Sequence, residues 1–219
     1  MAEQEHLQLS EDRTFTYRLC AGIVAAVAKV LFRPSVTGAQ NIPLTGPVLI
    51  APIHRSNVDF ALTLFISKRK VFFMAKDSLF RVPVLGTLIT HLGAFPVKRG
   101  SADRESMTLS EDVLRQGHAL VLFPEGTRKE GRAVAPLHDG AMFVAARAGA
   151  TIVPVGIGGS DRAMPKGAKL PHFAKIRIVV GAPIAPPVSE GRVARSALAA
   201  KSEELRAALE AAYHQSLND

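Results

Sequence analysis

The 219-residue chain contains one cysteine, Cys20, no tryptophan and only two tyrosines. A single cysteine cannot form a disulfide within the chain, which is typical of a protein from a reducing compartment with a buried thiol. Proteins that bind single-stranded nucleic acid usually interleave stacking aromatics with basic residues. Here the phenylalanines fall in apolar runs such as VFFMAK, and no helical or zinc module of a duplex-binding protein appears. We therefore expect no nucleic-acid partner.

Several kinds of segment are also missing. The first twelve residues, MAEQEHLQLSED, are acidic and polar, unlike a secretory signal or an Arg-rich transit peptide. No internal repeat and no low-complexity tract interrupts the chain, which excludes solenoid and disordered architectures. With 47% hydrophobic and 21% charged residues, a chain of this length fits one medium-sized domain.

The balance of charges is basic, with 27 Lys and Arg against 19 Asp and Glu and a formal net charge of +8. Such a charge suits nucleic acid, an anionic membrane surface or a phosphorylated substrate. Because the nucleic-acid modules are missing, we expect the second or third of these partners.

An amphipathic helix is predicted near the N-terminus, from a cap at Ser10 to Phe32, where Pro34 stops it. Only a short uncharged stretch lies between Arg18 and Lys29, whereas a spanning helix needs about 20 predominantly apolar residues. We therefore expect no segment that spans a bilayer. The helix either lies in the membrane interface or packs on the rest of the domain.

Strands and helices then alternate along the chain, which indicates an α/β fold: a single layered domain whose central, mostly buried sheet is flanked by helices. The expected strands are 47–53, 70–75, 94–99, 119–124, 151–157 and 174–181, and the expected helices are 58–67, 83–92, 101–116, 138–149 and 189–217. In such sheets ligands bind beyond the carboxyl ends of the strands.

Two hexapeptides place an Asp five residues after a His, a spacing that can build a general base with its orienting carboxylate. HRSNVD begins at His54 and ends at Asp59, whereas HQSLND runs from His214 to Asp219 at the end of the chain. His54 follows a buried strand, and the turn-prone RSN allows Asp59 to fold back at the start of the next helix. The second pair is expected in a solvated, frayed helix end.

More polar residues follow other predicted strands. GAFPVKR ends a strand with Lys98 and Arg99, and FPEGTR ends another with four polar or small residues, Glu125, Gly126, Thr127 and Arg128. A base with its carboxylate, two cationic clusters and a further carboxylate can thus converge at one edge of the sheet. The planar fork of arginine suits a phosphate, and glycine lets backbone N–H groups approach a ligand.

The blocks HRSNVD, GAFPVKR, FPEGTR and TIVPVGI, in this order and at these separations, resemble the four blocks of the glycerolipid acyltransferase family, in particular the bacterial lysophosphatidate acyltransferases. The similarity spans roughly residues 36–185. Two positions depart from the family pattern. Ile53 stands where Asn usually precedes the motif His, and His138 stands where a Lys is common.

The resemblance implies transfer of an acyl chain from a thioester, acyl-CoA or acyl carrier protein, to the hydroxyl of a lysophospholipid, with lysophosphatidate as the expected acceptor and no other cofactor. It implies that His54 takes the hydroxyl proton while Asp59 orients the ring and favours the imidazolium. No metal is expected, since the histidines are scattered and form no ligand cluster.

The other motif residues would bind substrate. The resemblance implies that Glu125 orients the glycerol and that Arg99 and Arg128 pair with the phosphate, supported by Lys98. Thr127 belongs to the same loop, and backbone amides near Gly126 are candidates for an oxyanion site.

Three alternatives remain open on the sequence. The acceptor could be another glycerolipid or a glycolipid. A thioesterase or lipid hydrolase could use the same His–Asp pair to activate water, although it would have no need of Arg99 and Arg128. A basic module that only binds membranes or nucleic acid would give no reason for Glu125 inside a basic loop.

The expected location follows from the substrates and the charge. We expect residues 1–33 to form an interfacial N-terminal helix and residues 34–219 to form the acyltransferase domain. The basic SKRK at 67–70 adds positive charge, so the sequence predicts peripheral attachment to the cytoplasmic face of the cell membrane.

Overall fold

The computed structural model describes residues 14–97, 104–187 and 193–218. Seven strands form one sheet in the order β1–β7–β6–β2–β5–β3–β4. The strands are β1 (Ser35–Thr37), β2 (Val48–Pro52), β3 (Val71–Lys76), β4 (Ala94–Val97), β5 (Ala119–Val121), β6 (Thr151–Gly158) and β7 (Arg177–Val180). All neighbours pair in parallel except β6 and β7.

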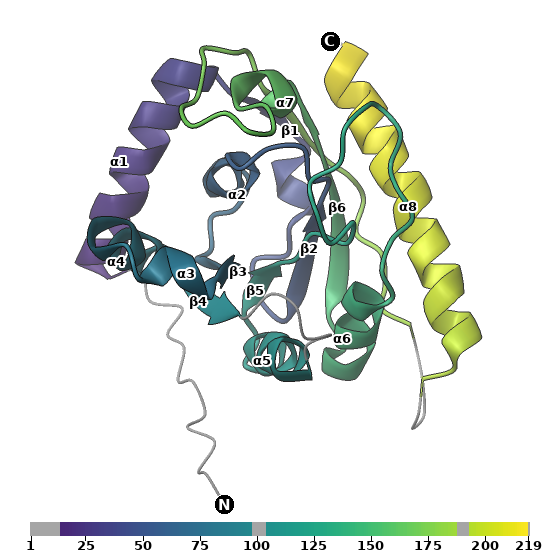
Figure 1. Ribbon diagram of the computed structural model, residues 1–219. Coiled ribbons are helices and arrows are strands. Elements are labelled where there is room, and N and C mark those ends of the chain that lie inside the picture. Colours follow the sequence, from purple (N-terminus) through teal and green to yellow (C-terminus); the bar gives the residue numbers. More distant parts are fainter. Residues whose placement is uncertain (1–13, 98–103, 188–192, 219) are drawn as a thin grey trace, which may run out of the picture.

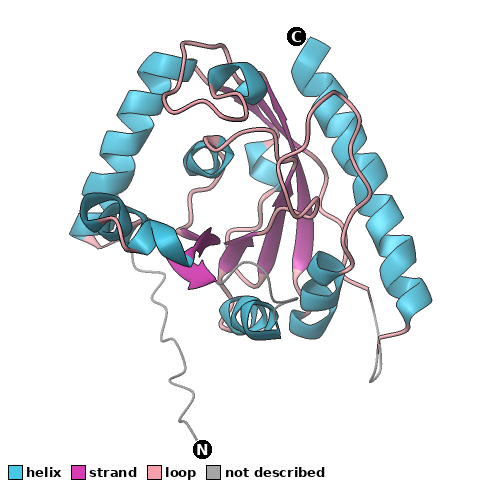
Figure 2. Ribbon diagram, in the orientation of Figure 1, coloured by secondary structure: helices cyan, strands magenta, loops and turns pink. Residues whose placement is uncertain are grey.

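Helices cover both faces of the sheet (Figure 1; Figure 2). The α-helices are α1 (Phe15–Phe32), α2 (Asp59–Leu62), α3 (Asp77–Phe80), α4 (Pro83–His91), α5 (Arg104–Arg115), α6 (Gly140–Ala148), α7 (Ser160–Ala163) and α8 (Arg195–Asn218), and the 3-10 helices are η1 (Ala39–Asn41) and η2 (Thr63–Phe65). In Figure 1 α1 to α4 lie on one side of the sheet and α8 lies along the other.

The predicted α/β architecture is confirmed, and each of the six predicted strands appears within a few residues of its expected position. One strand and two α-helices were missed. β1 is only three residues long, and α3 and α7 have four residues each. A strand of three residues and helices of about one turn are too short to leave a periodic pattern of apolar residues in the sequence.

The centre of the sheet is the strand β2, whose five residues are all buried. It lies between β5 and β6, with Ile50 opposite both Val121 and Val153. A strand covered on both faces reads as a continuous apolar run, as VLIAP does here. Because the three strands are parallel, the loops that follow them emerge at the same edge of the sheet.

The C-terminal helix α8 packs directly on β6. A Cβ atom on Gly156 would overlap the backbone carbonyl of Ala212, and a Cβ on Gly158 would overlap the backbone carbonyl of Ser216. The two glycines therefore allow the helix backbone to approach the strand. His214 is exposed as expected, and α8 continues to Asn218. The fraying of this end stays a prediction, and Asp219 lies outside the described residues.

The N-terminal helix α1 begins at a Thr14 cap, whose side chain accepts a hydrogen bond from the Tyr17 backbone N–H at 3.2 Å. The predicted cap at Ser10 lies outside the described residues. With 18 residues and a mean hydropathy of 1.6, α1 is long and apolar enough to cross a membrane by length and composition. The prediction that no segment is long and apolar enough to span a bilayer is therefore wrong. Arg18 and Lys29 lie near the two ends of the helix and interrupt its apolar stretch very little.

The two sides of α1 differ. One side belongs to the core, with Tyr17, Ala28 and Phe32 each at most 3% exposed, while half-buried Cys20 packs against it. The other side presents large apolar side chains to solvent at helical spacing, namely Phe15, Leu19, Ile23, Val27 and Val30. The packing of one side on the domain is confirmed, and the interfacial position of this helix stays a prediction.

The basic tetrapeptide SKRK is mostly structural. Arg69 is buried and donates hydrogen bonds to the backbone carbonyls of Pro43, Gly46 and Gly117. The Nζ atom of Lys70 lies 5.7 Å from the centre of the Tyr17 ring. Of these cations Lys68 is exposed, so the tetrapeptide adds less surface charge than predicted.

Candidate active site

His54 and Asp59 meet at the carboxyl end of β2, as the HRSNVD spacing predicts. The Nδ1 atom of His54 lies 3.0 Å from Oδ2 of Asp59, the first residue of α2. The same oxygen accepts hydrogen bonds from the backbone N–H groups of Arg55 and Ser56 at 2.8 and 2.7 Å. The tight turn between strand and helix is therefore held by the carboxylate that also orients the imidazole.

This contact assigns different hydrogen-bonding roles to the two ring nitrogens of His54. An ionised carboxylate can only accept hydrogen bonds, and Oδ2 of Asp59 already accepts from two backbone N–H groups, so Nδ1 is assigned as the donor in this contact. Nε2 then has a free lone pair and can accept a proton from a substrate. The ring stacks on Phe123 with 4.0 Å between ring centres, and the His54 side chain is 14% exposed. The imidazole is thus oriented, largely shielded and still accessible.

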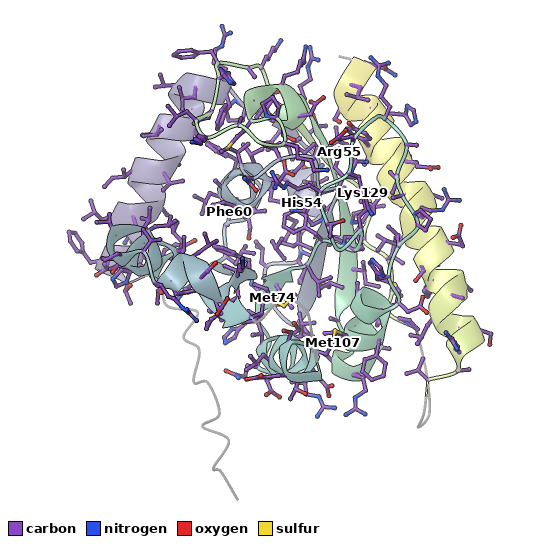
Figure 3. The ribbon with its side chains drawn as sticks, in the orientation of Figure 1. His54, Arg55, Phe60, Met74, Met107 and Lys129 are labelled. Carbon is purple, nitrogen blue, oxygen red and sulfur yellow. The ribbon has the colours of Figure 1, made fainter. Side chains whose placement is uncertain are left out.

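The loop after β5 holds the backbone of His54 on both sides. The His54 N–H donates to Oε2 of Glu125 at 3.0 Å, and its carbonyl accepts from the Lys129 N–H at 2.9 Å. Figure 3 shows His54, Arg55 and Lys129 close together at the end of β2. The FPEGTR loop therefore positions the candidate base, although the two motifs are about 70 residues apart in sequence.

Glu125 is fully buried and both of its carboxylate oxygens have protein partners. Besides the His54 N–H, Oε2 accepts from Nη1 of Arg55 at 2.7 Å, and Oε1 accepts from the Ala135 N–H at 3.0 Å. The predicted contact from Glu125 to the glycerol stays a prediction. What the geometry adds is a structural role, because this carboxylate joins the HRSNVD turn to the loop beyond β5.

Arg55 is the residue that sequence reasoning missed. It is 3% exposed, and besides Glu125 it donates to the carbonyls of Gly131 and Ala133 at 3.2 and 2.9 Å. Its guanidinium also lies 5.1 Å from the centre of the Tyr213 ring on α8. Burial raises the pKa of the Tyr213 phenol, although Arg55 acts in the opposite direction. Nothing in the sequence marks an arginine beside a motif histidine as buried.

The remaining predicted substrate residues fall into two groups. Lys98 and Arg99 lie outside the described residues, so their contact with phosphate stays a prediction. Thr127 is exposed, and Arg128 is half-buried. Arg128 lines a cleft of about 340 Å³ together with Arg55, Lys129, Glu130, Gly131, Asp161, Pro165 and Lys166. This cleft carries more positive than negative side chains, which suits an anionic group.

The FPEGTR loop makes a turn at Gly126, where φ is +70°. This positive φ favours glycine, and a Cβ atom there would lie 2.7 Å from Cδ2 of the exposed His138 ring, which would have to move. The backbone N–H groups of Gly126 and Thr127 donate to the carbonyls of Phe123 and Glu125. An oxyanion role for these two amides would therefore need the loop to rearrange.

The two departures from the family pattern occupy different environments. Ile53 is fully buried in the core, and its N–H donates to the Val155 carbonyl at 3.0 Å. His138 is exposed and covers Gly126.

The expectation that no metal is needed stays a prediction. Among the described residues, no group of three or more His, Cys, Asp or Glu side chains could hold a metal ion.

Comparison with known proteins gives consistent matches. The family model described as Acyltransferase matches residues 33–158, more than half of the chain. The 1-acyl-sn-glycerol-3-phosphate acyltransferase of Bacillus subtilis is 27% identical over 169 residues, 77% of this chain and 82% of that protein. The chloroplastic 1-acyl-sn-glycerol-3-phosphate acyltransferase BAT2 of Brassica napus is 27% identical over 70% of this chain and 45% of its own length. The chain thus spans less than half of that plant relative.

A solved structure shares the fold. The crystal structure of the 1-acyl-sn-glycerophosphate acyltransferase PlsC from Thermotoga maritima matches with a TM-score of 0.76 and 22% sequence identity, covering 94% of this chain and 84% of that one. The seven-stranded sheet with its flanking helices is therefore an arrangement already seen in a solved structure.

The buried pair gives a stability prediction. Glu125→Gln should leave the Arg55 guanidinium buried without its counter-charge, and removing one partner of such a pair typically costs about 3–5 kcal/mol. The free energy of unfolding, from urea titration, should fall by this order. Glu130→Gln is the matched control, since its carboxylate is 76% exposed and 3.4 Å from Lys166, and it should change stability by less than about 1 kcal/mol. Equal stability of the two variants would contradict the structural role of Glu125.

Proposed function

This chain belongs to the acyltransferase family, and we propose that it transfers a fatty acyl group from a thioester to the free hydroxyl of lysophosphatidate, which gives phosphatidate. The observation that carries the proposal is the His54–Asp59 contact of 3.0 Å at the carboxyl end of β2. The proposed acceptor rests on the activity for which the bacterial and plant relatives are named. The proposed donor is acyl-CoA or acyl carrier protein.

The proposed reaction needs one base and no covalent enzyme intermediate. Nε2 of His54 takes the proton from the glycerol hydroxyl as its oxygen attacks the thioester carbonyl. The new C–O bond forms, the C–S bond breaks, and the leaving thiolate takes the proton back from the imidazolium. Asp59, fully buried against Nδ1, stabilises that imidazolium while it exists.

Recognition of the acceptor's phosphate is proposed for Arg128, with Lys98 and Arg99 as further candidates from the sequence. Arg128 lines the cationic cleft beside Arg55, on the loop that also holds the backbone of His54. A phosphate bound there would place the glycerol near the base. The planar fork of a guanidinium can bind two phosphate oxygens at once, which fixes orientation as well as position.

We also propose peripheral attachment to the cytoplasmic face of the membrane through α1. The helix exposes a stripe of apolar side chains, while Tyr17, Ala28 and Phe32 on its other side are in the core. To cross a bilayer, α1 would have to leave these core contacts. Lying in the interface keeps them and buries the exposed stripe among lipids.

Replacing the proposed base should abolish most turnover. Removing a general base typically costs about 10²–10⁴ in rate, so we expect His54→Ala to lose activity by this factor when radiolabelled acyl-CoA is supplied with a panel of lysophospholipids. His214→Ala, on the exposed side of α8, should retain wild-type activity. Near-wild-type transfer by His54→Ala would contradict the assignment, and release of free fatty acid by the wild type without phospholipid product would identify a hydrolase.

The phosphate proposal is tested by a change of shape at constant charge. Arg128→Lys keeps one positive charge but cannot reproduce the bidentate fork. We expect a raised KM for lysophosphatidate with the KM for the thioester unchanged. Steady-state kinetics with phosphorylated and dephosphorylated acceptors measure the effect. Equal use of the two acceptors by the wild-type enzyme would show that no phosphate site contributes.

The mode of attachment is tested by extraction and by altering the stripe on α1. Membrane-bound protein should be released by high salt or alkaline carbonate, because each Lys or Arg near an anionic surface contributes only about 1 kcal/mol. Ile23→Ser combined with Val27→Ser should weaken sedimentation with anionic vesicles, whereas Leu44→Ser, also exposed, should not. Release by detergent alone would indicate a spanning helix instead.

A further inference from the structure

A second apolar surface lies away from the stripe on α1, in the connection between α7 and β7 that we name loop 164–175. Two of its side chains, Leu170 and Phe173, are 74% and 75% exposed, among the highest values for large apolar residues in the described segments. Single exposed apolar residues are common on soluble proteins. Two of this size in one short loop, three positions apart, need a reason.

The loop is also uniformly basic. Lys166, Lys169 and Lys175 are all exposed, and the sequence has no acidic residue between Asp161 and Glu190. Apolar tips flanked by cations are the pattern expected where a protein meets an anionic lipid surface.

The loop has a built shape with fixed ends. The Ala168 N–H donates to the Pro165 carbonyl at 3.0 Å, and the His172 N–H donates to the Ala163 carbonyl at 2.7 Å. The first bond closes a turn and the second ties residue 172 back to the end of α7, so the apolar tips are presented by a folded segment.

One end of the loop joins α1. The Ala174 N–H donates to the Leu31 carbonyl at 3.1 Å, and the Ile176 N–H donates to the Phe32 carbonyl at 3.0 Å. In Figure 1 the loop lies beside the C-terminal end of α1, the end that carries exposed Val27 and Val30. The loop thus adjoins the C-terminal end of the helix whose exposed side is apolar.

The other end of the loop joins the candidate active site. The hydroxyl of Ser56 donates to the Met164 carbonyl at 2.9 Å, and Ser56 lies inside the turn between His54 and Asp59. Whatever surface the loop contacts is therefore linked through one hydrogen bond to the catalytic turn.

We propose that loop 164–175 is a second membrane contact, in which Leu170 and Phe173 enter the lipid layer while Lys169 and Lys175 lie among anionic head groups. The proposal rests on the proposed attachment of α1, which supplies the neighbouring contact. An acidic protein could also meet the lysines. The two exposed apolar tips, and the backbone contacts that hold the loop beside the end of α1, favour a bilayer.

Two contacts orient the protein in a way that one helix cannot. A single helix lying in the interface lets the domain rotate about the helix axis, whereas a second contact beyond its end restricts that rotation. Because the second contact is tied through Ser56 to the turn between His54 and Asp59, that turn would be held near the lipid surface from which the acceptor comes.

The lack of tryptophan in the chain gives a direct test in the full-length protein. Leu170→Trp introduces a single indole at the loop tip. With vesicles of phosphatidylcholine and phosphatidylglycerol, we expect its emission to shift to the blue and to be quenched by lipids brominated on their acyl chains. Leu44→Trp is the matched control, because Leu44 is 64% exposed but precedes β2, at the opposite edge of the sheet from His54, and its emission should stay unchanged.

A loss-of-contact variant completes the test. Leu170→Ser with Phe173→Ser should reduce partitioning into the same vesicles by about tenfold or more, since each buried large apolar side chain contributes substantially to transfer from water. Lys169→Gln with Lys175→Gln should weaken binding at low salt more than at high salt. Leu44→Ser should change neither the partitioning into vesicles nor its dependence on salt.

The outcomes separate this proposal from the others. If the Leu170→Trp variant binds vesicles without any change in its indole emission, the loop contact is overturned while attachment through α1 stays intact. A shift of that emission caused by acidic acyl carrier protein, and not by vesicles, would overturn the loop contact in favour of a protein partner. Failure of acyl transfer would not alter these readings, since they require no turnover.

Discussion

The carboxylate of Glu125 is the constraint on which the site depends. It accepts hydrogen bonds from the backbone of His54, from the guanidinium of Arg55 and from the backbone of Ala135. These donors belong to the turn after β2 and to the long loop after β5. One buried side chain thus fixes the relative position of the candidate base and the loop proposed to bind phosphate, and Arg55 extends the same arrangement to Tyr213 on α8.

Such a pair is costly to bury, because both charges lose their hydration. The cost is offset here by the number of bonds that each group makes: Arg55 donates to Glu125 and to the carbonyls of His54, Gly131 and Ala133. An apolar pair of similar volume could pack equally well but could not hold the His54 backbone. The pair of Arg55 and Glu125 therefore holds the His54 backbone in position, and the fold is stable only while both partners are present.

The position of the site also links it to the outer surface of the protein. The turn between His54 and Asp59 contacts loop 164–175 through Ser56, and that loop forms backbone hydrogen bonds with the end of α1. Apolar side chains exposed on α1 and on the loop thus lie within a short chain of backbone contacts from His54. The proposed reaction would gain from this arrangement, because a lipid acceptor is concentrated at the bilayer surface.

The sequence by itself determined the α/β alternation, the strand-end placement of the motifs and the contact between His54 and Asp59. These features depend on apolar runs, turn residues and a separation of five positions, all of which act over short stretches of chain. Only the tertiary structure decided that Glu125 and Arg55 form a buried pair, that Arg69 is structural rather than a surface charge, and that α1 has one side in the core. Those outcomes depend on which strands are neighbours, and residues 70 positions apart meet only after the sheet has assembled.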